Sequence, residues 1–341
     1  LEYSATFEVF PDVELSAFDS IEVEKLEAEI NDQDVEEMVE KVREQRMQYE
    51  LAEKVAEDKD KVNIDFEGFI DNEAFDGGKA EGSDLILGSG QMIPGFETGI
   101  VGMGKGEEKE INVTFPEKYQ KADLAGKEAT FRIKLNSVSG PKLPEVDVAF
   151  IESFGLKGNA DLETFRKELK RNMQKELDNA IKIKIKEQVM DGLLAIHDII
   201  VPKALVEEEA ASMRNQMIQQ YGGGMKIEPE MLPSEMFSEQ AEKRVKSSLL
   251  LGSIIEKNEL VVSEEKTKEL IDQIAADYDD PDQVKNYYLS NEQELNRVNH
   301  VALEDMVVEL VMATATVSTK AVSYSEAVSR GANEETVATK N

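Results

Sequence analysis

The sequence predicts an α+β protein, in which a small antiparallel β-sheet domain with one short helix is joined to an elongated, all-α C-terminal domain with helical arms. Two observations along the 341 residues favour this division. Most of the 21 glycines lie between Gly68 and Gly140, where short apolar runs alternate with glycine-rich turns. Beyond Pro144 the chain is charged, poor in glycine and helical in its periodicity. We therefore expect three segments, which are residues 1–46, 47–141 and 142–341.

The first segment combines an extended stretch with a helix. Residues 1–15 are typical of a strand, because Phe7 and Val9 alternate with polar residues and a proline ends the run. Asn31 or Asp32 can cap a helix that follows. Its apolar positions then recur at helical spacing, at Val35, Met38, Val39 and Val42.

The second segment has the texture of an antiparallel sheet between about residues 61 and 139. In the run ATFRIKLNSVS, Phe131, Ile133 and Leu135 alternate with charged residues, as in a half-buried strand. The run PGFETGIVGM is instead typical of a short helix with glycine at its ends. The sequence therefore predicts strands joined by glycine turns, with one helix among them.

The third segment begins with an unusually long helix. Asp161 can cap it, and from Phe165 to Leu193 an apolar residue recurs at every fourth position. One uninterrupted helix over 161–198 would be about 57 Å long at 1.5 Å per residue, and only Gly192 could break it. We interpret Asp280-Pro281 as a breaker, and we expect further helices over 203–220, 234–257, 264–278 and 291–313.

The composition disfavours several classes of function. Lysine and arginine number 39 against 71 aspartates and glutamates, so the formal net charge is −32. An extended nucleic-acid surface needs clustered cations, and this balance disfavours one. The chain has no cysteine, which excludes disulfides, thiol nucleophiles and thiolate metal sites. No apolar run of about 18 residues is present, so we expect no membrane partner. No metal and no cofactor is expected.

Two loops resemble a phosphate-binding site and a calcium-binding site, but each lacks residues that its ligand requires. The run GIVGMGKG at 99–106 lacks the Ser or Thr that a phosphate-binding loop needs for Mg²⁺, and a strand-like run follows it. The acidic run at 277–282 has Pro281 at a calcium-ligand position and lacks the turn glycine. We expect His197 to be a helix-end or surface residue and His300 an ordinary helix residue, rather than catalytic groups.

Aromatic and apolar residues accompany the glycine turns in one ordered set of motifs. V-x-I-D-F-x-G, F-D, L-G-x-G-x-x-I-P-G-F-E-x-G-I and A-T-F-x-I-x-L follow one another over about residues 60–139. Composition alone favours a plain hydrophobic core, but this order resembles the FKBP-type peptidyl-prolyl isomerases. The resemblance implies a proline pocket lined by Phe66, Phe75, Asp76, Met92, Ile93, Phe96, Tyr119 and Phe131.

The same resemblance implies particular roles within that pocket. Met92 would offer its backbone N–H to a substrate carbonyl at the mouth, and Asp76 would be the polar group near the wall. Many members of the family carry Tyr where this chain has Phe66, and Trp at the floor where it has Phe96. The floor is then smaller, which disfavours bulky macrolide ligands more than it disfavours isomerase activity.

Such a pocket suits rotation about an X–Pro bond. Amide resonance opposes that rotation with a barrier of about 20 kcal/mol. Water strengthens the resonance, because it solvates the charge-separated planar amide. A dry aromatic pocket therefore favours the twisted, less polar transition state. No nucleophile, metal or proton relay is required.

The flanking segments resemble the bacterial trigger factor family. The similar stretches are ATFEVFPDVEL, LPEVDVAFIESFG, DNAIKIKIKEQVMDGLLAIHDIIVPKALVEEE, AEKRVKSSLLLGSIIEKNEL and RVNHVALEDMVVE. The resemblance implies an ATP-independent, cytoplasmic, ribosome-associated chaperone for newly made or unfolded polypeptides, with a link to cell division. The family's ribosome-docking run G-F-R-x-G-K-x-P is absent here. We therefore expect that residues 1–46 are a remnant of the N-terminal domain plus a linker, and that ribosome docking belongs to a longer parent protein.

Methionines on the helical segment suggest a surface for clients. Methionine is flexible and polarizable, which suits contact with many apolar sequences. We expect Met213, Met217 and Ile218 to remain accessible, although a helix–helix core is the alternative for any one of them. Two other functions stay open: a prolyl isomerase that acts on folded targets, with the helices forming a homodimer, and a non-catalytic FKBP-like binding scaffold.

Overall fold

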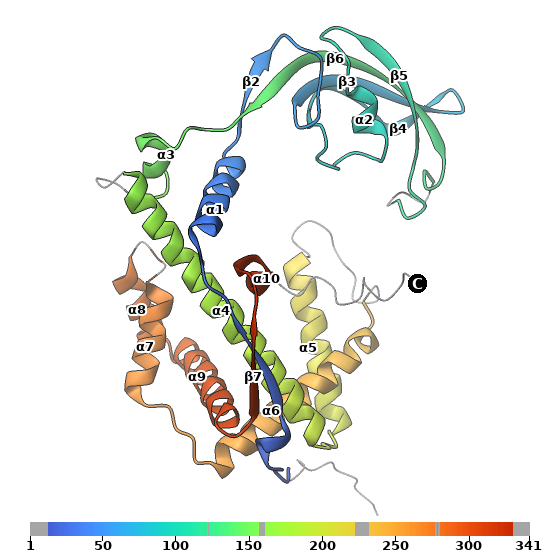
Figure 1. Ribbon diagram of the computed structural model, residues 1–341. Coiled ribbons are helices and arrows are strands. Elements are labelled where there is room, and N and C mark those ends of the chain that lie inside the picture. The colour runs from blue at the N-terminus through green and yellow to red at the C-terminus, as the bar shows by residue number, and fades with distance from the viewer. Residues whose placement is uncertain are drawn as a thin grey trace, which may run out of the picture. The chain divides into compact units, whose positions relative to one another are not determined.

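The structure is a computed structural model that describes residues 13–119, 121, 123–156, 161–221, 232–276, 278 and 280–329. Its elements in chain order (Figure 1) are η1 (Phe18–Ser20), β1 (Glu22–Glu27), α1 (Asp32–Gln45), β2 (Gln48–Ala52), β3 (Lys61–Ile70), β4 (Glu73–Ile86), α2 (Phe96–Ile100), β5 (Glu108–Thr114), β6 (Glu128–Lys142), α3 (Val148–Glu152), α4 (Leu162–Ile196), α5 (Lys203–Tyr221), η3 (Ser234–Phe237), α6 (Ser238–Lys257), α7 (Glu264–Ala275), α8 (Pro281–Ser290), α9 (Glu292–Met312), β7 (Thr316–Ala321) and α10 (Tyr324–Val328).

These elements form two compact units. One unit comprises residues 30–172, and the other combines residues 1–29 with residues 173–341. The first unit is therefore inserted into the sequence of the second, and the boundary after residue 172 falls within α4. The three segments expected from the sequence stay a prediction.

An antiparallel sheet of five strands lies in the inserted unit, as predicted. The strand order is β2-β6-β3-β4, and β5 also pairs with β6. Strand β3 pairs along one edge of β6. The other edge of β6 pairs with β5 at β6 residues 128–134 and with β2 at β6 residues 138–142. The pairing of β3 with β6 sets Gly68 opposite Phe131. Helix α2 lies beside the sheet (Figure 1) and contacts β5. It contributes buried side chains to the same domain.

The core of this sheet domain follows the alternation read from the sequence. Along β6, Phe131, Ile133 and Leu135 are buried, whereas Arg132 and Lys134 between them are exposed. Burying three such side chains stabilises the fold by several kcal/mol, at roughly 1.5–3 kcal/mol each. The expectation of a half-buried strand is confirmed.

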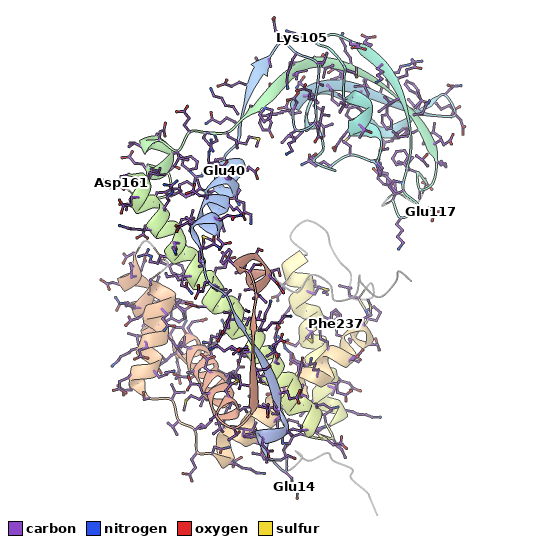
Figure 2. The ribbon with its side chains drawn as sticks, viewed as in Figure 1. Glu14, Glu40, Lys105, Glu117, Asp161 and Phe237 are labelled. Carbon is purple, nitrogen blue, oxygen red and sulfur yellow. The ribbon has the colours of Figure 1, made fainter. Side chains whose placement is uncertain are left out.

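Helices α1, α3 and the start of α4 form a smaller core in the inserted unit. The side chain of Asn31 caps α1 by accepting hydrogen bonds from the N–H groups of Gln33 and Asp34. A separate apolar cluster joins α1 to α3 and α4 through Val39, Phe150, Ile151 and Phe165. Figure 2 marks Asp161 at the start of α4, where its carboxylate accepts a hydrogen bond from Thr164 N–H at 2.8 Å.

The second unit is mainly helical, as expected. Helix α4 is continuous through Gly192, which confirms the long helix. A Cβ atom at Gly192 would lie 2.6 Å from Cγ2 of Ile21, so glycine allows the N-terminal segment to approach this helix closely. The helices expected over 203–220, 234–257, 264–278 and 291–313 are all present. Among the described residues, no helix is long and apolar enough to cross a bilayer.

Two features of the second unit differ from the sequence-based expectation. Strand β7 pairs in parallel with β1, from Glu22 opposite Thr316 to Glu27 opposite Ala321, so the C-terminal region is not all-α. Asp280-Pro281 begins a helix rather than breaking one. The aspartate caps α8 and the proline occupies the first turn, where its missing N–H costs nothing.

The strand expected over 1–15 lies mostly outside the described residues. His197 is buried near the end of α4, with Nδ1 2.7 Å from the carbonyl oxygen of Leu193. Its Nε2 accepts a hydrogen bond from Ser16 N–H at 3.0 Å. The helix-end role is therefore confirmed, and the surface role is wrong. His300 lies exposed on α9.

Candidate functional site

A pocket of about 470 Å³ opens in the sheet domain. Its wall is built from β3, β4, β6, α2 and the segments before α2 and after β5. The structure brings together all eight residues that the resemblance implied, and each lines this pocket: Phe66, Phe75, Asp76, Met92, Ile93, Phe96, Tyr119 and Phe131. Their convergence is a structural result, while their part in catalysis stays a prediction.

Interlocked aromatic rings form the apolar wall. The ring of Phe96 is fully buried, and its centroid lies 5.5 Å from that of Phe66 and 5.2 Å from that of Phe131. Both contacts are nearly perpendicular, with interplanar angles of 80° and 85°. Phe75 meets Phe131 at 5.9 Å and 88°. Edge-to-face contacts of this kind are favourable, so each ring fixes the orientation of the next.

Two glycines leave the space that the Phe75 ring occupies. A Cβ atom at Gly68 would lie 2.7 Å from Cε1 of Phe75, and one at Gly78 would lie 2.8 Å from the same ring. The Gly68 position would also be 2.6 Å from Cε1 of Phe131. The final glycine of the V-x-I-D-F-x-G motif therefore has a steric reason in the pocket wall.

The mouth of the pocket differs from the expectation in its hydrogen bonds. The N–H of Met92, which the sequence analysis assigned to a substrate carbonyl, donates to Oε1 of Glu97 at 3.1 Å. This N–H is therefore not free in the structure, and its contact with a substrate stays a prediction. The carbonyl oxygen of Ile93 accepts from Phe96 N–H at 3.1 Å, but within the described residues the N–H of Ile93 has no hydrogen-bond partner. Ile93 also lines the pocket, so its N–H is a pocket donor with no acceptor among the described residues.

Glu97 is a buried carboxylate beneath the loop that precedes α2. It is 8% exposed, and its oxygens accept hydrogen bonds from the N–H of Gly90 at 3.1 Å and from Oγ of Ser89 at 3.3 Å, in addition to Met92. Burial alone would raise the pKa of the Glu97 carboxyl. The backbone donors outweigh burial, so the pKa of Glu97 lies below its ordinary value and the group is charged at neutral pH.

Asp76 lies at the rim rather than deep in the wall. Its side chain is exposed, and its carbonyl oxygen is 3.3 Å from Nζ of Lys121, which also lines the pocket. The rim is therefore polar, whereas the floor at Phe96 is apolar. A substrate can keep its flanking peptide groups solvated while an apolar ring enters the pocket.

The residues expected to meet clients lie on α5. None of the three is buried: Met217 is 37% exposed, and Met213 and Ile218 are half-buried. Met213 and Met217 line a groove of about 440 Å³ between α5 and α6, with Phe237 as its most buried wall, whereas Ile218 lies outside it. Figure 2 labels Phe237 beside these two helices. The expected accessibility is observed, and the client role stays a prediction.

Comparison with known proteins places this geometry in a family. A model of the FKBP-type peptidyl-prolyl cis-trans isomerase matches residues 52–136, the stretch that contains all eight pocket residues. Models of the bacterial trigger factor protein match residues 1–42, and of its C-terminus residues 161–313. The trigger factor of Pseudomonas putida (strain W619) is 51% identical over 328 residues, which cover 96% of this chain and 74% of that protein. The chain belongs to the trigger factor family.

A second curated relative and one solved structure are also similar to this chain. The trigger factor of Alcanivorax borkumensis is 49% identical over 328 residues, covering 96% of this chain and 75% of the relative. A solved trigger factor chaperone, studied for promiscuous substrate recognition, shares 20% identity with a TM-score of 0.40, covering 89% of this chain and 73% of that one. As a member of this family with an FKBP-type domain, the protein is a peptidyl-prolyl cis-trans isomerase.

Sequence reasoning missed part of this trigger factor family member's pocket. Phe115 is 3% exposed, and its ring lies 5.8 Å from that of Phe75 and 4.8 Å from that of Tyr119. A signal for it was present, because Ile111, Val113 and Phe115 alternate in one strand and its extension. The other unpredicted lining residues are Gly77, Gln91, Pro94, Pro116, Lys121 and Leu124.

Proposed function

We propose that this protein is an ATP-independent chaperone for newly made or unfolded polypeptides, and that its aromatic pocket rotates their X–Pro bonds. The observation that supports this most is the convergence of eight residues, implied by sequence motifs far apart in the chain, on one pocket. The isomerase itself follows from the family. The substrate class, the energy source and the residue roles are the proposal.

The geometry suggests how the pocket lowers the barrier. A proline ring packs on Phe96, between rings whose edges are fixed by their neighbours. The N–H of Ile93 donates to a carbonyl beside the proline and holds that peptide group while the X–Pro bond turns. The aromatic wall offers no water to the twisting amide, so its planar, more polar form loses solvation. Each 1.4 kcal/mol removed from a barrier of about 20 kcal/mol gives a tenfold gain in rate.

A refolding assay tests the pocket. An unfolded protein whose refolding is limited by proline isomerisation serves as substrate, with wild type compared with Phe96→Ala and Tyr119→Ala. The second variant is included because removing a fully buried ring costs about 3–5 kcal/mol of stability, whereas Tyr119 is half-buried. Phe69→Ala, an aromatic residue on β3 outside the pocket, is the matched control.

We expect both pocket variants to lose most of the catalysis and the control to keep it. If Tyr119→Ala and Phe96→Ala both folded and catalysed refolding as fast as wild type, the isomerase site would have to lie outside this pocket. A wild type that binds unfolded chains without catalysing the refolding would favour the binding-scaffold alternative.

The groove between α5 and α6 is the proposed client surface. Met213 and Met217 are its flexible apolar residues, and the exposed fraction of Met217 shows that neighbouring helices leave it uncovered. In an aggregation assay without ATP, Met213→Ser combined with Met217→Ser should weaken protection of an unfolded client. Met236→Ser, exposed but outside the groove, is the control. Unchanged protection by the double variant would refute this surface.

We further propose that the protein acts in the cytoplasm, and that ribosome docking belongs to a longer parent protein through the family's N-terminal domain, whose model matches residues 1–42 of this chain. Co-sedimentation of this chain and of a longer family member with ribosomes tests where docking resides. A stable homodimer in sedimentation analysis, with strong preference for one residue before proline, would instead favour an isomerase of folded targets.

A further inference from the structure

We infer that Glu97 is a positioning residue of the isomerase site, which fixes the loop at residues 88–93 so that the N–H of Ile93 stays available to the substrate. This inference rests on the proposed function, because it assumes that the pocket holds the proline. It assigns to Glu97 a role for which sequence reasoning offered no candidate.

The loop's own backbone geometry shows what the carboxylate does. Gly88 and Gly90 both have positive φ, of 83° and 69°, which is conformational space that side chains rarely adopt. Their conformation helps the N–H groups of Gly90 and Met92 to turn toward the two oxygens of Glu97. Converging backbone N–H groups form an anion-binding concavity, and here the anion is supplied by the chain itself.

This arrangement leaves the N–H of Ile93 without an acceptor among the described residues. Met92 N–H is held by Glu97, and the carbonyl of Ile93 is held by Phe96 N–H. The N–H of Ile93 lies between these two hydrogen-bonded groups, so its position is fixed from both sides while it remains free to donate to a substrate. Glu97 directly follows Phe96, the residue at the floor of the pocket, in α2. The position of the loop at the pocket mouth is therefore coupled to the position of the floor.

Loss of the carboxylate should therefore make the loop at residues 88–93 more mobile without creating a cavity in the hydrophobic core. In Glu97→Gln the side chain keeps its size, but it presents an NH₂ group where one oxygen accepted a hydrogen bond. Misplacing a binding group by about 1 Å can cost up to a hundredfold in rate. We expect kcat/KM to fall about tenfold or more under conditions in which the variant remains folded.

Amide hydrogen exchange separates positioning from simple destabilisation. In wild type the amides of Gly90 and Met92 should be protected, and in Glu97→Gln they should exchange faster while the amide of Leu135 in β6 is unchanged. Glu107→Gln is the matched control, since Glu107 also accepts a loop N–H, from Gly104 at 2.8 Å, but does not line the pocket. It should leave kcat/KM unchanged.

Each outcome is decisive. Full activity in folded Glu97→Gln overturns the inference and leaves the proposed function standing. A wild type without catalysis overturns both. If Glu97→Gln does not fold, the same measurements are made on Glu97→Asp. The aspartate side chain is too short to reach the N–H groups of both Gly90 and Met92. Fast exchange of the Gly90 and Met92 amides in wild type would overturn the inference without any variant.

Discussion

Replacing Gly68 by alanine tests the packing of the pocket wall. Gly68 lies on β3 opposite Phe131, and its φ is not in the left-handed region, so the backbone accepts alanine. The new Cβ would lie 2.6 Å from Cε1 of Phe131 and 2.7 Å from Cε1 of Phe75. Ordinary van der Waals contact begins at 3.4 Å, so the two rings must retreat by roughly 0.7–0.8 Å.

The size of the effect follows from two opposing contributions. Overpacking a tight core costs about 1–3 kcal/mol. Alanine in place of glycine in a strand returns about 0.5–1 kcal/mol. We therefore expect Gly68→Ala to lower the free energy of unfolding by on the order of 1–2 kcal/mol. Because both displaced rings line the pocket, kcat/KM in the proline-limited refolding assay should fall by about tenfold.

Gly104→Ala is the matched control for this prediction. It lies in the same domain without positive φ, and the nearest atom to its Cβ would be 3.8 Å away, at Oε2 of Glu107. Urea unfolding and the refolding assay should show little change for this variant. If Gly68→Ala behaved like Gly104→Ala in both measurements, the argument that glycine is needed beside Phe75 and Phe131 would be refuted.

Three further outcomes are expected. Gly192→Ala should destabilise the protein in thermal unfolding because of the close Ile21 contact. Gly252→Ala in α6, where nothing lies within 4 Å, should stabilise it by about 1 kcal/mol. If both variants changed the stability in the same direction, this reasoning would be contradicted. Asp60→Ala should cost about 1–3 kcal/mol in urea unfolding, because this 1% exposed carboxylate accepts a backbone hydrogen bond and pairs with a lysine at 3.0 Å. Glu97→Gln should be less stable than wild type at neutral pH, and the difference should narrow below pH 4.5, since a carboxyl with a lowered pKa loses its contribution as the pH falls through that pKa.

Much of the sheet domain could be predicted because its signals are local. Alternation along β6 identified the buried face of Phe131, Ile133 and Leu135, and glycine turns separated the strands. The pocket residues were found by resemblance in motif order, not by physical reasoning about distance. Phe115 was missed because the motifs did not include it, although its alternation with Val113 was visible.

Other features have weak or misleading local signals. The sequence TVSTKA of β7 has no apolar face, and all six residues are exposed, so nothing nearby predicts that it pairs with β1. Asp280-Pro281 is compatible with both a break and a helix start, and only the hydrogen bond to Gln283 N–H decides between them. Glu97 follows an aromatic residue in a short polar run, and only the folded loop reveals what its carboxylate holds.

The pairing of β1 with β7 has a consequence for the order in which the chain can fold during its own synthesis. Glu22 must wait for Thr316, which is made 294 residues later, and at 5–20 residues per second that is a delay of about 15–60 s. The inserted unit of residues 30–172 is contiguous and can close well before that. The segment that carries β1 is thus among the first made and among the last to find its partner. During that interval this chaperone is itself an incomplete polypeptide with an unpaired strand.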